Sequence, residues 1–134
     1  MVSRNIWVVD DDDVDLMTYQ RTFRVLDYKD LNITYFKDSE TMLLALEGGG
    51  QSPDLIFLDL NLPGLNGIES LQRIRQSGFY LPVVILSTSS NSADISVALK
   101  AGANAYFDKP VGFERFMEIV RNNIAFWFDQ NLRE

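Results

Sequence analysis

The chain has 134 residues, of which 46% are hydrophobic, and these values fit one globular domain with a single core. It contains neither cysteine nor histidine, which excludes disulfides, thiolate metal sites and Ser-His-Asp catalysis. The net charge of −7 disfavours nucleic acid as a partner, and the sequence shows neither a membrane span nor a signal peptide, so we expect a cytoplasmic protein.

Short apolar runs alternate with helical patterns along the whole chain. Strands are expected at residues 5–10, 32–36, 54–59, 82–87 and 104–108. A helical pattern follows each strand. In the fourth of these, Ile95, Ala98 and Leu99 form the apolar stripe and Asn91 is the N-cap. Strict alternation predicts a doubly wound α/β fold, a five-stranded parallel sheet in the order 2-1-3-4-5 with helices on both faces.

Four consecutive aspartates, Asp10 to Asp13, follow the first expected strand. Carboxylates at the end of a buried strand repel one another and lose hydration unless a cation holds them. We therefore expect Asp10 and Asp11 to bind a divalent metal. Asp12, Asp13 and Asp15 are expected to be solvated, with Asp13 also a candidate N-cap of the first helix.

Polar side chains also end the other central strands of the predicted sheet. Strand 3 ends in Asp59, strand 4 in Ser87, and strand 5 in Asp108-Lys109-Pro110. Ligands of such sheets bind beyond the carboxyl ends of the strands, between strands 1 and 3. Carboxylates beside a hydroxyl and an ammonium favour Mg²⁺ and phosphoryl transfer, in which positioning and charge neutralisation do most of the catalysis. An ionised carboxylate can act as the nucleophile there without an activating base.

These motifs together resemble the receiver domain of two-component response regulators. The matching segments are Val8-Val9-Asp10-Asp11, Leu58 through Gly64, Leu81 through Ser87, Gly102-Ala103 and Tyr106 through Pro110, in family order over nearly the whole chain. The resemblance implies phosphorelay signalling, in which a histidine kinase or phosphotransfer protein phosphorylates Asp59 in a Mg²⁺-dependent reaction. The chain would then be a regulator that assists its own phosphorylation and dephosphorylation, not an enzyme in the usual sense.

The resemblance also implies a role for each site residue. The metal ligands would be Asp10, Asp11, Asp59 and the backbone carbonyl of Asn61. Lys109 would pair with Asp59 and then with the phosphoryl group, to which Ser87 would hydrogen-bond, and Tyr106 would rotate in response. The bond between Lys109 and Pro110 would be cis. Asn61 and Ser89 stand where the family tunes the lifetime of the phosphoryl group.

The resemblance is to a stand-alone receiver, with residues 1–134 forming one domain and no output domain. The sequence of its motifs is similar to that of small regulators paired with phytochrome-type or hybrid histidine kinases. Phe126, Trp127 and Phe128 are consecutive, and because helical neighbours point about 100° apart, at least one must lie outside the core-facing arc. We expect either a homodimer through the fourth helix, fifth strand and fifth helix, or a helix end that folds back over the core.

Three other functions are compatible with parts of the pattern. A haloacid-dehalogenase-like phosphatase also uses an Asp nucleophile, but it needs a second Asp two residues later, where this chain has Asn61. A flavodoxin-type cofactor binder would need a phosphate loop after strand 1, where the aspartates would repel phosphate. A receiver-like interaction module that is never phosphorylated remains open. The downstream target cannot be read from the sequence.

Overall fold

The computed structural model describes residues 3–88 and 91–128. Five strands alternate with five helices along this part of the chain. The strands are β1 (Arg4–Val9), β2 (Leu31–Phe36), β3 (Leu55–Leu58), β4 (Val83–Ser87) and β5 (Ala105–Asp108). The helices are α1 (Asp13–Leu26), α2 (Ser39–Glu47), α3 (Gly67–Gln76), α4 (Ser92–Ala101) and α5 (Phe113–Phe128).

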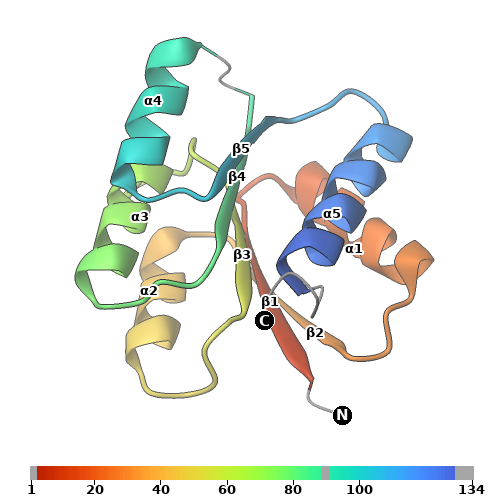
Figure 1. The fold of residues 1–134 in the computed structure, drawn as a ribbon, viewed down its shortest axis with the longest axis horizontal. Helices are drawn as coiled ribbons and strands as arrows, with labels where there is room; N and C mark the ends of the chain where they lie inside the picture. Colours follow the sequence, from red (N-terminus) through yellow and green to blue (C-terminus); the bar gives the residue numbers. More distant parts are fainter. Residues whose placement is uncertain (1–2, 89–90, 129–134) are drawn as a thin grey trace.

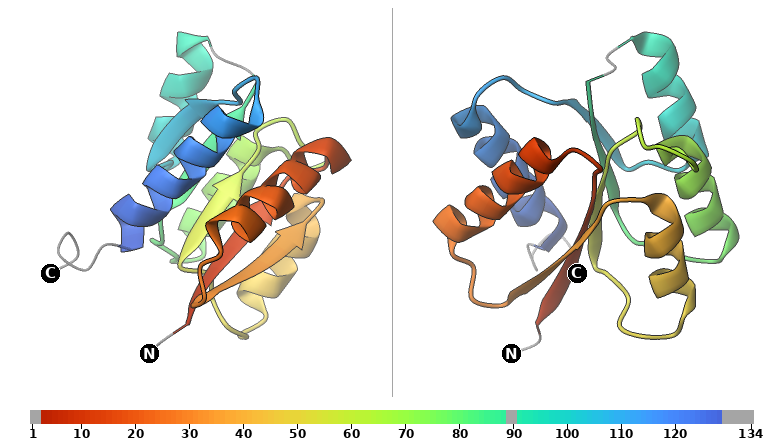
Figure 2. Two further views of the ribbon diagram at one scale, coloured as in Figure 1. Left: turned by 90° about the vertical axis from the view of Figure 1, so that its right-hand side faces the viewer. Right: turned by 180° about the vertical axis from the view of Figure 1, so that it is seen from behind.

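The strands form one parallel sheet in the order β2-β1-β3-β4-β5, which confirms the predicted fold and strand order. The helices lie in two layers, with α1 and α5 on one face of the sheet and α2, α3 and α4 on the other (Figures 1 and 2). Each strand bound differs from its predicted one by about a residue. Because all the strand pairs are parallel, the carboxyl ends of the five strands meet at one edge of the sheet.

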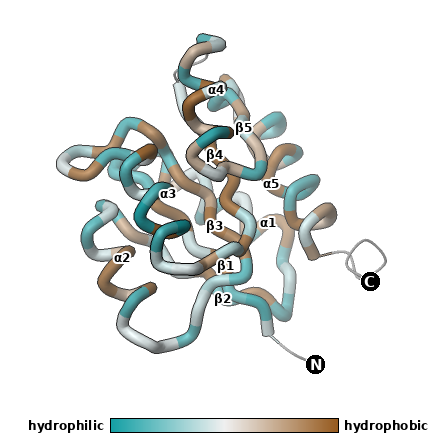
Figure 3. The backbone as a smooth tube through the Cα atoms, turned by 60° about the vertical axis from the view of Figure 1, so that its left-hand side comes forward, coloured by the Kyte–Doolittle hydropathy of each residue, from teal (hydrophilic) through white to brown (hydrophobic). Residues whose placement is uncertain are grey.

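Two apolar cores flank the sheet because the central strands are buried on both faces. All residues of β3 and β4 are buried. In Figure 3, where the tube is coloured by the hydropathy of each residue, β3 is mostly in the hydrophobic colour. Side chains alternate between the faces: Val8 and Phe57 pack with α1 and α5, whereas Val9 and Leu58 pack with the other three helices. This alternation also decides which helix layer a residue just beyond each strand will face.

Polar caps begin four of the helices. The side chains of Asp12, Asp38, Asn66 and Asn91 accept hydrogen bonds from backbone N–H groups in the first turns of α1, α2, α3 and α4. The first helix is therefore capped by Asp12, and the interpretation of Asp13 as its cap is wrong. Asp12 is the last residue with extended backbone, and a cap needs that conformation so that its side chain can turn back to the helix.

The two C-terminal helices differ in how they pack. In α4 only Ala98 is buried, and Leu99 is 48% exposed, so its expected place in the apolar stripe is wrong. The stripe instead runs through buried Ala98 and partly buried Ile95 and Ala101, and Leu99 lies about 100° around the helix from Ala98. In α5, Phe126 is 55% exposed while Trp127 packs on the core, which confirms that one aromatic residue lies outside the core-facing arc.

None of the helices in the described part of the chain is both long enough and apolar enough to span a membrane.

Candidate phosphoryl and metal site

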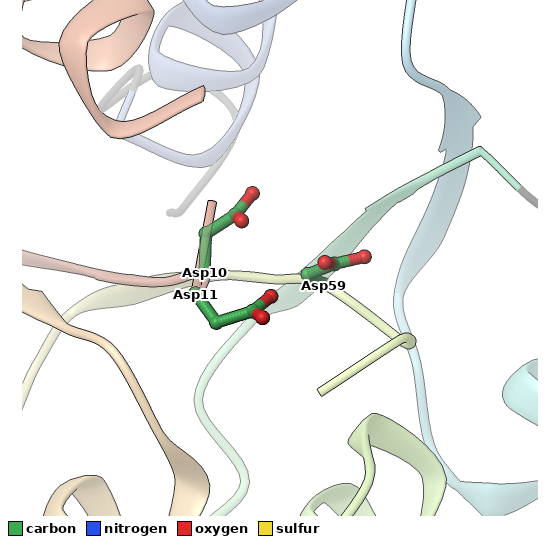
Figure 4. Close-up of side chains that lie close together, drawn as sticks. All are labelled: Asp10, Asp11 and Asp59. Carbon is green, nitrogen blue, oxygen red and sulfur yellow. The ribbon is translucent and has the colours of Figure 1, made fainter. Parts of the chain in front are cut away.

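Three carboxylates meet at the carboxyl edge of the sheet. Asp10 follows β1, Asp11 is next in the chain, and Asp59 follows β3, the strand paired with β1 (Figure 4). The backbone N–H of Asp59 donates to the carbonyl of Val9 at 3.0 Å, so the ladder carries on to the start of the loops. One oxygen from each of the three carboxylates can be chosen so that all three lie within 4.8 Å of one another.

This donor set fits a divalent cation. Its ligand atoms are all oxygen, and hard cations such as Mg²⁺ prefer oxygen ligands. Asp10 and Asp59 are buried, whereas Asp11 is exposed beside a cavity of about 530 Å³ that Asn61 and Asp94 also line. A small solvated ion or phosphodonor can therefore approach the carboxylates from this side.

Lys109, which follows β5, reaches the same edge from the side of α1 and α5. Its ammonium lies 2.9 Å from Asp10 Oδ2, 3.3 Å from Asp59 Oδ2 and 2.7 Å from Asp15 Oδ2. The side chain of Lys109 is 10% exposed, so these contacts are shielded from water. The structure thus brings Lys109 beside Asp59, as expected, and adds a carboxylate that the sequence analysis assigned to solvent.

Asp15 is a site residue that sequence reasoning missed. It lies in the first turn of α1, one turn before buried Tyr19, so it faces the sheet and not the solvent. The spacing of four residues between Asp15 and Tyr19 was the available signal. It was overlooked because Asp15 follows a run of aspartates in which Asp11, Asp12 and Asp13 are indeed exposed.

For each of the clustered groups, burial and the interaction between Lys109 and the carboxylates act on the pKa in opposite directions. Burial raises the pKa of Asp10 to about 6, although hydrogen bonds from Lys109 and from the N–H of Asp12 oppose the shift. Burial likewise raises the pKa of Asp59, against the charge of Lys109. Burial alone would lower the pKa of Lys109, but its hydrogen bonds to Asp15 and Asp10 outweigh burial and raise it. One ammonium therefore does not fully compensate the carboxylates that surround it.

Asn61 and the buried hydroxyl of Ser87 lie on the β4 side of Asp59. The N–H of Asn61 donates to Asp59 Oδ1 at 3.3 Å, and its side-chain amide donates to Ser87 Oγ at 3.2 Å and to Thr88 Oγ1 at 3.4 Å. Tyr106 lies opposite Ile85 in the β4–β5 ladder and packs on the core below α4. Ser89 lies outside the described residues.

The loop between β3 and α3 is held by two residues that the sequence analysis did not single out. Glu40 of α2 accepts a hydrogen bond from the N–H of Leu65 at 3.0 Å, next to Gly64, whose φ is +69°. Gly67 packs so closely that a Cβ there would lie 2.5 Å from the carbonyl oxygen of Asp59. Gly67 therefore allows α3 to approach the backbone of Asp59.

The expected cis bond before Pro110 is wrong, because all described peptide bonds are trans. An X–Pro bond still favours trans by about 0.5–1 kcal/mol. Lys109 contacts its three carboxylates from this trans backbone, so its placement does not require the cis form.

Comparisons with known proteins agree on one family. Residues 6–121 match the response regulator receiver domain. The chain is 33% identical over 132 residues to the probable methanogenesis regulatory protein FilR2 of Methanothrix harundinacea, covering 94% of this chain and 84% of that protein. Longer relatives match too: the chain spans 34% of the nitrate/nitrite response regulator NarL of Escherichia coli, at 38% identity over 73 residues.

Two solved structures share the whole fold at 28% identity. The phosphorylated cyanobacterial phytochrome response regulator RcpA superposes with a TM-score of 0.88 over 96% of each chain. The Mn²⁺-bound form of the response regulator Rcp1 superposes with a TM-score of 0.81 over 92% of this chain and 94% of that one. Given the family match, the strand order and the acidic edge, this chain belongs to the response regulator receiver domain family.

Proposed function

We propose that this chain is a phosphorelay regulator that accepts a phosphoryl group on Asp59 from a histidine kinase or a phosphotransfer protein. The observation that carries the proposal is the set of groups around Asp59 at the edge of the sheet. Oxygens of two other carboxylates lie within 4.8 Å of an Asp59 oxygen, and the Lys109 ammonium lies 3.3 Å from Asp59 Oδ2. These 134 residues contain no histidine, so they cannot themselves supply the phosphohistidine.

The transfer needs no general base. A carboxylate oxygen of Asp59 attacks the phosphorus of the phosphohistidine, and a P–O bond forms as the P–N bond breaks. The electron pair of the P–N bond remains on the imidazole nitrogen. Lys109 lies where its ammonium can neutralise charge on the phosphoryl oxygens, and the adjacent cavity of about 530 Å³ leaves room for the donor.

Asp10, Asp11, Asp59 and the backbone carbonyl of Asn61 are the proposed holders of Mg²⁺. When bound, the ion would supply positive charge that offsets these carboxylates and the incoming phosphoryl group. The pKa values of Asp10 and Asp59 support a cation at this place, since burial and a neighbouring carboxylate raise both although Lys109 lies beside them.

The response to phosphorylation is proposed to pass through Ser87 and Tyr106. Both lie on the face of the sheet that α3 and α4 cover: Ser87 continues the alternation of Val83 and Ile85, and Tyr106 packs with the same core. A phosphoryl group that draws the Ser87 hydroxyl towards Asp59 would leave room for the Tyr106 ring to move. The exposed side chains Val97, Leu99 and Phe126 support an output or homodimer surface over α4, β5 and α5.

Intact-mass measurement with acetyl phosphate tests the proposal without a partner protein. The wild type is expected to gain one phosphoryl group in Mg²⁺ and none in EDTA, and Asp59→Asn is expected to gain none. Asp27→Asn is the matched control, because Asp27 lies at the surface in an ion pair with Lys29 and should leave phosphorylation unchanged. No Mg²⁺-dependent adduct on the wild type, or an undiminished one on Asp59→Asn, would favour a receiver-like interaction module that is never phosphorylated.

A further inference from the structure

Lys109 has three N–H donors and three carboxylate neighbours, and these neighbours differ in what else they do. Asp10 and Asp59 belong to the cluster of carboxylates that can hold a metal ion, whereas Asp15 does not. Asp15 nevertheless makes the shortest of the three contacts, 2.7 Å against 2.9 Å and 3.3 Å. The carboxylate nearest to the ammonium is thus the one that lies outside the cluster able to hold a metal ion.

We propose that Asp15 is a positioning residue for Lys109, keeping the ammonium at the edge of the sheet when Asp10 and Asp59 turn to a metal ion and a phosphoryl group. This inference rests on the proposed function of the site. Without Asp15, Lys109 would lose its partners at the stage when its charge is needed, and its flexible four-carbon side chain could swing into the adjoining cavity. That cavity, of about 480 Å³, is lined by both Asp15 and Lys109.

The fold holds Asp15 in place independently of the metal. It lies between the N-cap Asp12 and buried Tyr19 on α1, a helix that packs against α5 and the sheet. Its side chain is 28% exposed, so water screens the pair only in part. By the alternation along the strands, Asp10, Asp59 and Lys109 all continue the residues that face α1 and α5, which is why one residue of α1 can reach the ammonium.

Removal of the Asp15 charge tests the proposal, because an electrostatic role and a positioning role predict opposite changes in the rate of phosphorylation. An extra carboxylate near Asp59 should repel an anionic phosphodonor, so a purely electrostatic role predicts that Asp15→Asn accelerates phosphorylation by acetyl phosphate. A positioning role predicts the opposite. Because a displacement of about 1 Å can cost up to about 10²-fold in rate, we expect Asp15→Asn to be slower by about tenfold.

The experiment measures the rate of adduct formation by intact mass at fixed Mg²⁺ and acetyl phosphate for Asp15→Asn, Lys109→Gln and the double variant. If Asp15 acts through Lys109, the double variant should react as slowly as Lys109→Gln and no slower. Asp15→Glu, which keeps a carboxylate, should recover part of the rate. Asp13→Asn is the matched control, because Asp13 is an exposed acid of the same helical turn that pairs with Lys37.

A second readout needs neither metal nor phosphodonor. In EDTA, the effects on the urea midpoint should be non-additive when Asp15→Asn is combined with Lys109→Gln, and additive when Asp13→Asn is combined with Lys109→Gln. An Asp15→Asn rate equal to or above that of the wild type, or rate losses that multiply in the double variant, would overturn the positioning role. A wild type that forms no adduct would instead overturn the proposed function, and the inference with it.

Discussion

The substitution Asp10→Asn should stabilise the metal-free protein while it weakens metal binding. Asp10 is 1% exposed and its carboxylate shares one ammonium with Asp15 and Asp59. Asparagine has nearly the same shape, and its side-chain oxygen can still accept the N–H of Asp12, which lies 3.0 Å from Asp10 Oδ1. The variant therefore removes a costly buried charge and keeps the local turn.

The size of the gain follows from the pKa of Asp10, which burial raises from 3.8 to about 6. At about 1.4 kcal/mol per unit of pKa, ionisation of this carboxylate in the folded protein costs up to about 3 kcal/mol. Between the two pKa values the folded state binds the proton more tightly than the unfolded one. Stability that is fully present below about pH 4 is consequently lost as the pH rises through about 6. The gain from Asp10→Asn should thus be about 1–3 kcal/mol above pH 7 and should shrink towards pH 4.

Urea unfolding in EDTA, followed by tryptophan fluorescence between pH 4.5 and 8, measures this dependence. Trp7 is buried in β1 and should report the loss of the core. Addition of Mg²⁺ should raise the unfolding free energy of the wild type more than that of the variant, because only the folded wild type has the full set of carboxylates. A destabilised variant at pH 8, or a gain that grows as the pH falls, would refute the reasoning about buried charge.

Three further changes probe the loops and the surface. Gly67→Ala should lower the unfolding free energy by about 1–3 kcal/mol and slow adduct formation on Asp59, because the added Cβ would meet the Asp59 carbonyl oxygen at 2.5 Å; urea melts and intact mass measure both effects. Asn66→Ala should cost about 1 kcal/mol in the same melts, since Asn66 and Glu69 form a capping box at α3, and an unchanged midpoint would contradict that role. Phe126→Ser should change stability by less than about 0.5 kcal/mol, yet reduce self-association in sedimentation if the proposed homodimer surface is used.

Much of the fold and part of the site followed from local patterns. Each strand was predicted to within about a residue, because apolar runs between turn residues mark buried strands without reference to any partner. The strand order followed from right-handed crossovers. Since parallel strands end at one edge, the order alone brought Asp10, Asp59, Ser87 and Lys109 together.

What failed were statements about contacts between elements. Asp15 and Glu40 are acidic helix residues of the kind that usually faces solvent. In the structure, however, Asp15 pairs with Lys109, and Glu40 accepts a hydrogen bond from the loop before α3. Leu99 has the spacing of a core residue but lies beside the arc of α4 that meets the sheet. These outcomes depend on how far each helix is rotated about its axis, because a rotation of tens of degrees changes which side chains face the sheet. Side-chain packing sets that rotation.

The sequence by itself therefore determined the architecture, the edge at which the site lies and the residue types that meet there. Only the tertiary structure decided which carboxylate binds the ammonium most closely, how near α3 comes to Asp59, and that the bond before Pro110 is trans. Hydrophobic periodicity and the right-handed crossover between strands are local properties, which short stretches of the chain determine. Distances of 2.7–3.3 Å between residues far apart in sequence arise only when all the layers pack at once.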